Sequence, residues 1–370
     1  MKKRGNSFFI KTLLFFNFAV IIALLLSYCA TIINPLTFWY FTLFGLAYPF
    51  ILLANVLFII FWAILKRWYF IYSLLFILIG FKPLTRTFGF RLSNTDFVTD
   101  SNTLKLMTYN VHNFRTQEGI LDTALSKNFY SMIKSEDPDV VGFQEFFTRT
   151  KGKFDFKDSL LKVLNTKQYF YSKTDFNDYE SLGIAVFSKY PIVNSAEIQF
   201  DSIAIGNKAV FIDIQKGNKT LRVYVVHLAS ISFQPEDYSF INEVKKDLNT
   251  NEDVVSSKRI VKKLKNAFVK RSNEVKVLKE HIESCTTPYI IMGDFNDTPV
   301  SFALAEMTKG LKNAFQDKGS GLGVTYNGAF PNFQIDYILA SPTLDFSSYK
   351  IIKKDLSDHY PVRANVVLGN

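Results

Sequence analysis

The sequence has few cysteines and histidines, and its first 91 residues contain no Asp or Glu. Cys285 is the only cysteine after Cys29, so no disulfide can form within the C-terminal region. No internal repeat or low-complexity tract is present. The C-terminal region of roughly 270 residues is long enough to bury a full core without help from metal or disulfides.

Three apolar runs fill the segment that lacks acidic residues. They extend over Thr12–Ile33, Phe38–Leu65 and Trp68–Phe81. The first has about the length that spans a bilayer, the second is longer and is bent by Pro49, and the third is short. The first run is too long for a signal peptide and lacks a small-residue cleavage site, so we expect it to be retained. We predict a membrane anchor of three transmembrane helices, with two helices as the alternative.

Basic residues indicate how this anchor is oriented. Lys2 to Lys11 place the N-terminus in the cytoplasm, and Lys66-Arg67 marks a second cytoplasmic turn. Three helices then put the rest of the chain on the exterior, periplasmic side of an inner (cytoplasmic) membrane, whereas two helices put it in the cytoplasm. We favour the exterior because the third run is too apolar to lie in water.

The chain divides into an anchor at 1–91, a linker at 92–102 and a second domain at 103–370. Nine of the ten net positive charges belong to the anchor, so the remainder lacks the basic character typical of nonspecific nucleic-acid binders. Lysines do cluster between Lys245 and Lys279, where apolar residues recur at helical spacing. This pattern predicts one or two amphipathic helices packed on a sheet, with a lysine face that is either solvated or binds a membrane surface or phosphate.

Polar residues repeatedly follow short apolar runs in the second domain. In YIIMGDFNDTP (289–299) a predicted buried strand ends at Gly293, which lets the backbone turn away. The segments LKLMTYNVHNF, DVVGFQEFF, RVYVVHLAS and FQIDYILAS show the same pattern, and SDHYPV (357–362) precedes the last apolar stretch. Three of the four histidines lie in these segments, namely His112, His227 and His359. Because loops held by a rigid sheet concentrate catalytic groups, we expect one shared site.

These motifs resemble, in the same order, those of the endonuclease/exonuclease/phosphatase superfamily, which includes DNase I-like nucleases, abasic-site endonucleases, inositol polyphosphate phosphatases and neutral sphingomyelinases. The resemblance rests on TYNV, FQE, VVHL, GDFN, IDYIL and SDHYPV and extends over roughly residues 100–370. It implies an α/β (α+β) four-layer sandwich of two mixed β-sheets flanked by helices, here preceded by the transmembrane helical anchor. The short strands and the turn residues are compatible with this DNase I-like fold.

Hydrolysis of a phosphate ester requires neutralised nonbridging oxygens, a water in line with the leaving oxygen, and a proton for that oxygen. The resemblance assigns the activation of water to Asp294, and Asn296 can hold that water or a phosphate oxygen without adding negative charge. His359 resembles the histidine that contacts the scissile phosphate. Asp336 resembles the carboxylate that orients this histidine and raises its pKa.

Further positions resemble ligand residues of the family. His227 resembles a phosphate ligand or an acid near the leaving group, and Asn110 resembles an amide that touches phosphate or metal. Glu145 offers hard oxygen ligands for Mg²⁺, with Mn²⁺ as a substitute, and Asp358 resembles a second acid on the metal side or the water side. Many abasic-site members carry an acid where this chain has His112, which argues against abasic-site repair. A capping or core position and a catalytic role both stay open for His112.

The sequence therefore predicts a membrane-tethered, Mg²⁺-dependent phosphoesterase that hydrolyses a phosphodiester or phosphomonoester by metal-assisted in-line attack of water. The substrate class stays open between nucleic acid, a lipid headgroup and another phosphodiester, because the fold hosts all of them. The alternatives are a nuclease acting on DNA or RNA, and a catalytically silent module that binds a phosphate ligand or docks a partner. The acids and imidazoles retained together favour the enzyme, and no protein partner follows from the sequence.

Overall fold

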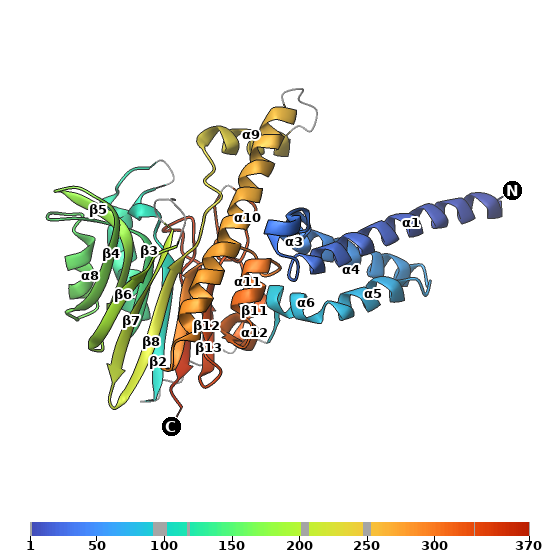
Figure 1. The fold of residues 1–370 in the computed structure, drawn as a ribbon. Helices are drawn as coiled ribbons and strands as arrows, with labels where there is room; N and C mark the ends of the chain where they lie inside the picture. Colours follow the sequence, from blue (N-terminus) through green and yellow to red (C-terminus); the bar gives the residue numbers. More distant parts are fainter. Residues whose placement is uncertain are drawn as a thin grey trace.

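The structure is a computed structural model that describes residues 2–91, 102–116, 119–200, 207–246, 253–328 and 330–369. Figure 1 shows two parts, a bundle of N-terminal helices and a larger domain built on β-sheets. The helices of the N-terminal bundle are α1 (Lys2–Cys29), α2 (Pro35–Phe38), α3 (Tyr40–Leu46), α4 (Tyr48–Ile64), α5 (Phe70–Ile79) and α6 (Phe81–Thr87).

A buried polar cluster joins three helices of the N-terminal bundle. The side chain of Asn17 in α1 accepts a hydrogen bond from Nε1 of Trp62 in α4 at 2.8 Å and donates one to Oγ of Ser73 in α5 at 2.7 Å. All three side chains are buried. On the outside of the bundle, large apolar side chains such as Phe15 and Ile64 are exposed. Polar groups inside and apolar groups outside are typical of helices that pack within a membrane.

Length and composition limit the number of membrane spans. Phe8–Cys29 in α1 is long and apolar enough to cross a membrane. Helices α3 and α4 are inclined to each other by 62°, and α5 and α6 by 79°. If each bent pair counts as one span, the described residues contain up to three candidate membrane spans. Pro49, the predicted site of bending, lies in the first turn of α4, immediately after the break.

The domain contains two mixed sheets of six strands each. The first has the order β13-β14-β2-β3-β5-β4, with β2 (Thr103–Asn110), β3 (Val140–Arg149), β4 (Gln168–Phe176), β5 (Glu180–Ser188), β13 (Asp345–Ile351) and β14 (Val362–Val367). The second has the order β10-β12-β9-β8-β7-β6, with β6 (Ile192–Ile198), β7 (Lys208–Lys216), β8 (Lys219–His227), β9 (Tyr289–Asp294), β10 (Lys312–Asn313) and β12 (Asp336–Ala340). Each sheet has one parallel pair, β2 with β3 and β8 with β9.

The inner faces of the two sheets share one apolar core. It includes Leu106 and Val140 of the first sheet and Val225 and Met292 of the second. Gly142 of β3 shows how closely the sheets approach, because a Cβ at this position would lie 2.6 Å from the side chain of Val225. The sheets therefore pack face to face as a sandwich.

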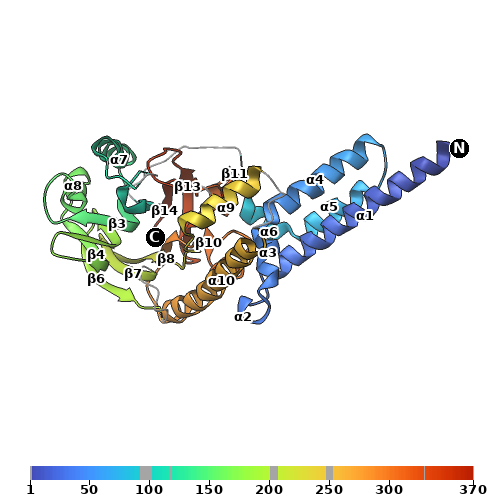
Figure 2. The same ribbon diagram turned by 90° about the horizontal axis from the view of Figure 1, so that it is seen from above.

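Helices cover the outer faces of the sandwich (Figure 2). On the first sheet, α7 (Thr123–Glu136) and α8 (Phe156–Val163) pack through apolar side chains. On the second sheet, α10 (Asp253–Glu283) and α11 (Phe302–Met307) do the same. The other helices of the domain are α9 (Pro235–Lys246), α12 (Ala314–Lys318) and a short 3-10 helix at His112–Phe114. The prediction of two mixed sheets flanked by helices is confirmed. In the lysine-rich region, Lys245 and Lys246 end α9, and residues 253–279 lie in the long helix α10, in agreement with the expected one or two helices.

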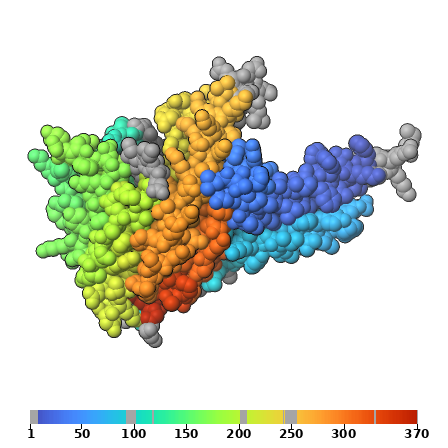
Figure 3. All heavy atoms as spheres, viewed as in Figure 1, coloured from blue at the N-terminus to red at the C-terminus, as the bar shows by residue number. Residues whose placement is uncertain are grey.

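The N-terminal bundle is docked against the domain (Figure 3). The buried side chain of Arg86 in α6 donates a hydrogen bond from Nη2 to Oγ1 of Thr308 at 2.8 Å. Strand β1 (Phe88–Phe90), in the stretch that the sequence assigned to the anchor, pairs antiparallel with β11 (Ser320–Leu322) of the domain. Val300 of the domain packs in an apolar cluster with side chains of α1, α4 and α5. Hydrogen bonds and apolar packing together hold the two parts in contact.

Candidate active site

Strand pairing brings the predicted site residues to one edge of the sheets. His227 and Asp294 end the parallel strands β8 and β9 and lie opposite each other. Asp336 begins the antiparallel strand β12 and also lies opposite Asp294. Asn110 ends β2, and Glu145 lies in β3, its parallel neighbour. The carboxyl ends of parallel strands meet at the same edge, which explains why segments far apart in the sequence gather here.

The Oδ2 atom of Asp294 lies at the centre of this group. It accepts hydrogen bonds from Nδ2 of Asn110 at 3.0 Å and from Nδ2 of Asn296 at 3.2 Å. The Nε2 atoms of His227 and His359 lie 3.8 and 3.7 Å from the same oxygen. Asp294 is only 1% exposed, and burial raises the pKa of its carboxyl. A raised pKa suits a carboxylate that takes a proton from water near neutral pH.

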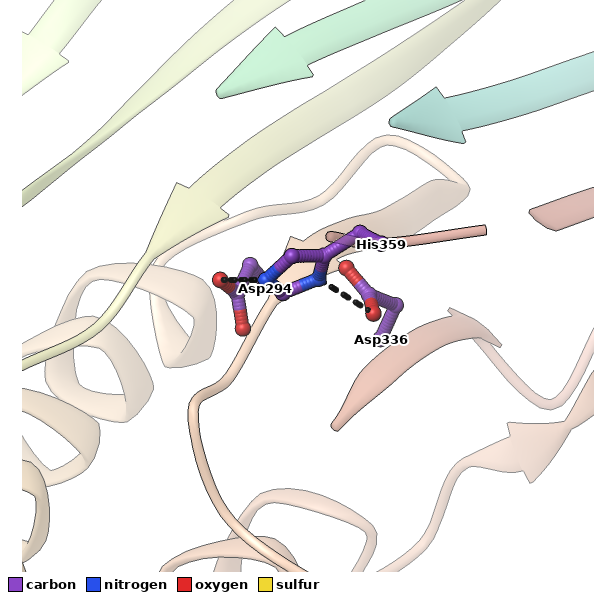
Figure 4. A group of neighbouring side chains, drawn as sticks. All are labelled: Asp294, Asp336 and His359. Carbon is purple, nitrogen blue, oxygen red and sulfur yellow. Dashed lines mark hydrogen bonds and ion pairs between the residues drawn. The ribbon is translucent and has the colours of Figure 1, made fainter. Parts of the chain in front are cut away.

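His359 and Asp336 form a buried acid–imidazole pair (Figure 4). The Nδ1–H of His359 donates to Oδ2 of Asp336 at 3.0 Å, while Nε2 faces Asp294. Burial of the imidazole opposes its charged form, but the carboxylates of Asp336 and Asp294 outweigh this and hold the pKa of His359 well above its ordinary value. The raised pKa favours the positively charged form of this imidazole.

Two residues shape the GDFN segment. Gly293 has a φ of 147°, and a Cβ there would lie 2.1 Å from the carbonyl oxygen of Val226, so the backbone requires glycine. Asn296 has a φ of 52°, and its backbone N–H donates to Oδ1 of Asp294 at 2.8 Å. Its Nδ2 also donates to the carbonyl oxygen of Leu228 at 2.9 Å. These bonds hold the amide of Asn296 beside the carboxylate of Asp294.

Glu145 lies at a β-bulge, where the pairing of β3 with β5 shifts register and φ of Glu145 is 50°. Its Oε1 accepts a hydrogen bond from Nδ2 of Asn110 at 3.2 Å. Nδ1 of His112 lies 3.7 Å from Oε2 of Glu145 and 3.7 Å from Oδ2 of Asp358. The side chain of His112 is 41% exposed and lines the same pocket, so His112 lies at the site and not in the core.

The Nε2 atom of His227 is buried and has no hydrogen-bond partner within the described part of the chain. It lies 3.8 Å from Oε1 of Glu145 and 3.8 Å from Oδ2 of Asp294. Buried polar atoms almost always have a partner. An oxygen atom of a ligand between His227 and these carboxylates would supply the missing hydrogen bond.

Two sets of side chains offer ligands for a divalent ion. The partly exposed carboxylates of Glu145 and Asp358 provide hard oxygen ligands, which Mg²⁺ prefers. In the described residues, Asp294, Asp336 and His359 also bring ligand atoms within 4.8 Å of one another. In this second set, however, Nδ1 of His359 is already hydrogen-bonded to Asp336. The chemistry of the donor atoms therefore fits the first set better.

A pocket of about 230 Å³ opens over these groups. Several of its lining residues were not predicted from the sequence, namely Leu46, Ile231, Phe233, Tyr238, Leu264, Phe268, Arg271, Tyr326, Phe330 and Phe333. The ring of Tyr326, for example, packs edge-on against His359 with ring centroids 5.3 Å apart. None of these residues follows an apolar run in the way that marks the strand-end polar groups, so the pattern used for the other site residues could not find them.

Two family models match the chain. A model of the endonuclease/exonuclease/phosphatase family matches residues 107–359. A model described as a domain of unknown function matches residues 10–87, which include most of the N-terminal bundle. No curated protein sequence matches the chain.

Solved structures share the fold at low sequence identity. The endonuclease/exonuclease/phosphatase from Beutenbergia cavernae is 17% identical with a TM-score of 0.52, and the match covers 73% of this chain and 72% of that one. The endonuclease/exonuclease/phosphatase from Bacteroides vulgatus is 17% identical with a TM-score of 0.51, and the match covers 71% of this chain and 98% of that one. The human Nocturnin catalytic domain, solved with a bound sulfate anion, is 17% identical with a TM-score of 0.50, and the match covers 73% of this chain and 96% of that one.

Proposed function

The chain belongs to the endonuclease/exonuclease/phosphatase family and is a hydrolase of phosphate esters, and from this we propose that it is a membrane-tethered, divalent-metal-dependent phosphodiesterase. One observation carries the proposal. A single buried oxygen, Oδ2 of Asp294, lies within 4 Å of side-chain nitrogens of Asn110, Asn296, His227 and His359. A base with amide donors and imidazoles around one buried oxygen provides the groups that in-line attack of water on phosphorus requires.

In this mechanism Asp294 accepts a proton from the attacking water while Asn296 orients that water. The water oxygen bonds to phosphorus as the bond between phosphorus and the leaving oxygen breaks. The charged imidazole of His359 stabilises the negative charge that develops on the nonbridging oxygens, and Asp336 holds this imidazole in place. His227, whose Nε2 is buried and unpartnered within the described residues, protonates the leaving oxygen.

Glu145 and Asp358 would hold a Mg²⁺ ion in this site, with Mn²⁺ as a substitute. When bound, the ion neutralises the nonbridging oxygens and so lowers the barrier to attack. The carboxylates of Glu145 and Asp358 are 29% and 22% exposed, which leaves room for the waters that Mg²⁺ usually keeps. Asn110, whose Nδ2 donates to both Glu145 and Asp294, connects the proposed metal ligand to the proposed base.

The shape of the N-terminal bundle supports the tether and its orientation. Figures 1 and 2 show the N-terminus and the turn between α4 and α5 at the end of the bundle far from the domain. This turn carries Lys66 and Arg67. Because basic residues remain on the cytoplasmic side, one span or three place the domain on the exterior of an inner membrane, whereas two place it in the cytoplasm.

The test uses the full-length protein in detergent micelles with bis(para-nitrophenyl) phosphate as substrate. We expect hydrolysis with Mg²⁺ or Mn²⁺ and none in excess EDTA. Glu145→Gln should raise the Mg²⁺ concentration for half-maximal rate by about tenfold or more, because it weakens a metal ligand. Asp294→Asn should lower turnover by about two to four powers of ten, while the exposed control Asp178→Asn should leave it unchanged.

Two results would contradict this proposal. Undiminished activity in EDTA would exclude the metal. Turnover within about threefold of the parent in Asp294→Asn would show that Asp294 is not the base.

A further inference from the structure

The N-terminal bundle forms part of the wall of the active-site pocket. Leu46, the last residue of α3, lines the pocket together with Asn296 and His359. Close packing determines its position, because a Cβ added to the preceding Gly45 would lie 2.2 Å from the carbonyl oxygen of Val300 in the loop after the GDFN segment. The pocket is therefore incomplete without the bundle, although the residues proposed for chemistry all lie in the domain.

Apolar side chains continue this wall. Leu264 and Phe268 of α10, together with Phe330 and Phe333 of the loop that precedes β12, line the same pocket as Leu46. Leu264 and Phe268 also pack closely, since they are only 6% and 3% exposed. The pocket thus places an apolar wall beside the polar groups that act on phosphate. This combination fits an amphiphilic substrate.

Few Lys or Arg side chains line the pocket itself, although Lys263 of α10 lies beside it, where its Nζ donates to the carbonyl oxygen of the lining Ser232 at 3.1 Å. Among the described lining residues, Arg271 is the only Lys or Arg, and it is 1% exposed. Its Nε lies 3.4 Å from Oδ2 of Asp297, so part of its charge is offset. A nucleic-acid strand carries a phosphate at every nucleotide and is normally held by several Lys or Arg contacts. The described lining does not provide them, which favours a substrate with a single phosphate group at the site.

The apolar wall lies on the side of the domain that faces the bundle. Helices α2 and α3 are at the end of the bundle that meets the domain, next to α10 (Figures 1 and 2). In this segment Leu36, Phe38 and Tyr40 are 58, 55 and 60% exposed. Exposed aromatic and apolar side chains at the end of a span are typical of the membrane–water interface. The segment that carries these exposed side chains ends at Leu46, so the apolar wall adjoins the part of the bundle expected at a membrane surface.

We propose that the substrate is a membrane lipid with a phosphodiester headgroup, and that Leu46 and the apolar side chains of α10 hold its apolar part while its phosphorus lies at Asp294. This inference rests on the proposed function. The water oxygen bonds to phosphorus, the bond from phosphorus to one ester oxygen breaks, and the released alcohol gains a proton. The products are an alcohol and a phosphomonoester, and no reactant other than water is consumed.

The experiment compares two probes that differ only in chain length, methyl para-nitrophenyl phosphate and hexadecyl para-nitrophenyl phosphate. Both are presented with Mg²⁺ to the full-length protein in mixed micelles. We expect kcat/KM for the hexadecyl probe to exceed that for the methyl probe by about a hundredfold. Leu46→Asn should reduce this ratio about tenfold, and Leu46→Met should preserve it. Leu36→Asn, in the same segment but outside the pocket, should have no effect, which controls for the shared micelle.

Each other outcome contradicts either the lipid assignment or the proposed phosphodiesterase activity. If both probes react equally, or if Leu46→Asn lowers both rates alike, the lipid assignment is wrong while the phosphodiesterase activity stands. If thymidine para-nitrophenyl phosphate reacts faster than the hexadecyl probe, the substrate is a nucleotide or nucleic acid. If no probe reacts with either Mg²⁺ or Mn²⁺, the proposed function fails and the lipid assignment fails with it. Thermal unfolding of each variant, compared with that of the parent, shows whether the variant is folded.

Discussion

Replacement of Asp336 is expected to impair catalysis only while His359 is present. Asp336 lies behind the imidazole, 3.0 Å from Nδ1, and it does not line the pocket. Its contribution is a buried hydrogen bond to a charged group, a type that contributes about 1.5 to 3 kcal/mol. Because about 1.4 kcal/mol corresponds to a factor of ten in rate, Asp336→Asn should lower kcat by about ten- to a hundredfold.

Removal of the imidazole should cost more. His359→Ala takes away the positive charge that faces the phosphate and should lower kcat by about two to four powers of ten. With the imidazole absent, Asp336 keeps only a secondary influence, as one of the charges that raise the pKa of Asp294. The double variant should therefore match His359→Ala within about threefold, and the coupling energy between the two sites should equal the whole loss seen in Asp336→Asn.

The assay is a double-mutant cycle on kcat with bis(para-nitrophenyl) phosphate and saturating Mg²⁺. Thermal unfolding of each variant should show that the buried substitutions leave the protein folded at the assay temperature. Losses that multiply as if the two sites were independent would refute the positioning role of Asp336. If both single variants turn over substrate at nearly the rate of the parent, His359 has no catalytic role either.

Three further predictions concern pH, the bundle and orientation. Burial opposes the charged form of His359, yet the carboxylates of Asp336 and Asp294 raise its pKa, so the pairing of His359 with Asp336 stabilises the fold below about pH 6.5, and this contribution is lost as pH rises through the raised pKa. Because Asp336→Asn removes one of these charges, the alkaline limb of the kcat/KM profile should move to lower pH in this variant. An alkaline limb that does not move would contradict the pairing. Asn17→Ala removes the hydrogen bonds to α4 and α5 and should destabilise the detergent-solubilised protein by about 1 kcal/mol per bond, measured by thermal unfolding. A cysteine at the exposed Lys151, with both native cysteines replaced, should react with a membrane-impermeant thiol reagent in intact cells, and labelling only after lysis would place the domain in the cytoplasm.

Local sequence patterns were sufficient for the type of the strands that carry the site and of the long helix α10. The run before Gly293 predicted the strand β9, and the helical spacing within the lysine-rich region predicted α10, because both signals depend on residues a few positions apart. The order of the GDFN and SDH motifs was specific enough to indicate the family and the two-sheet sandwich. Composition alone also separated the apolar N-terminal segment from the domain.

The distances within the site depend on strand pairing. Asp294 and Asp336 are opposite each other because β9 and β12 pair antiparallel in a particular register, which neither segment specifies alone. The bulge in β3 turns Glu145 towards the pocket, and the same fold brings His112 to Glu145 and Asp358. A sequence pattern could mark these residues as polar groups at strand ends, but it could not state which atoms meet.

The contribution of the N-terminal bundle was decided by tertiary structure alone. The sequence by itself determined that residues 1–91 are apolar and free of acids, and so predicted an anchor. It contained no sign that Leu46 lines the pocket or that Phe88–Phe90 pairs with Ser320–Leu322. The physical reason is that hydrophobicity and helical period are properties of neighbouring residues, whereas contact between segments more than 200 residues apart arises only when both parts are folded and packed together.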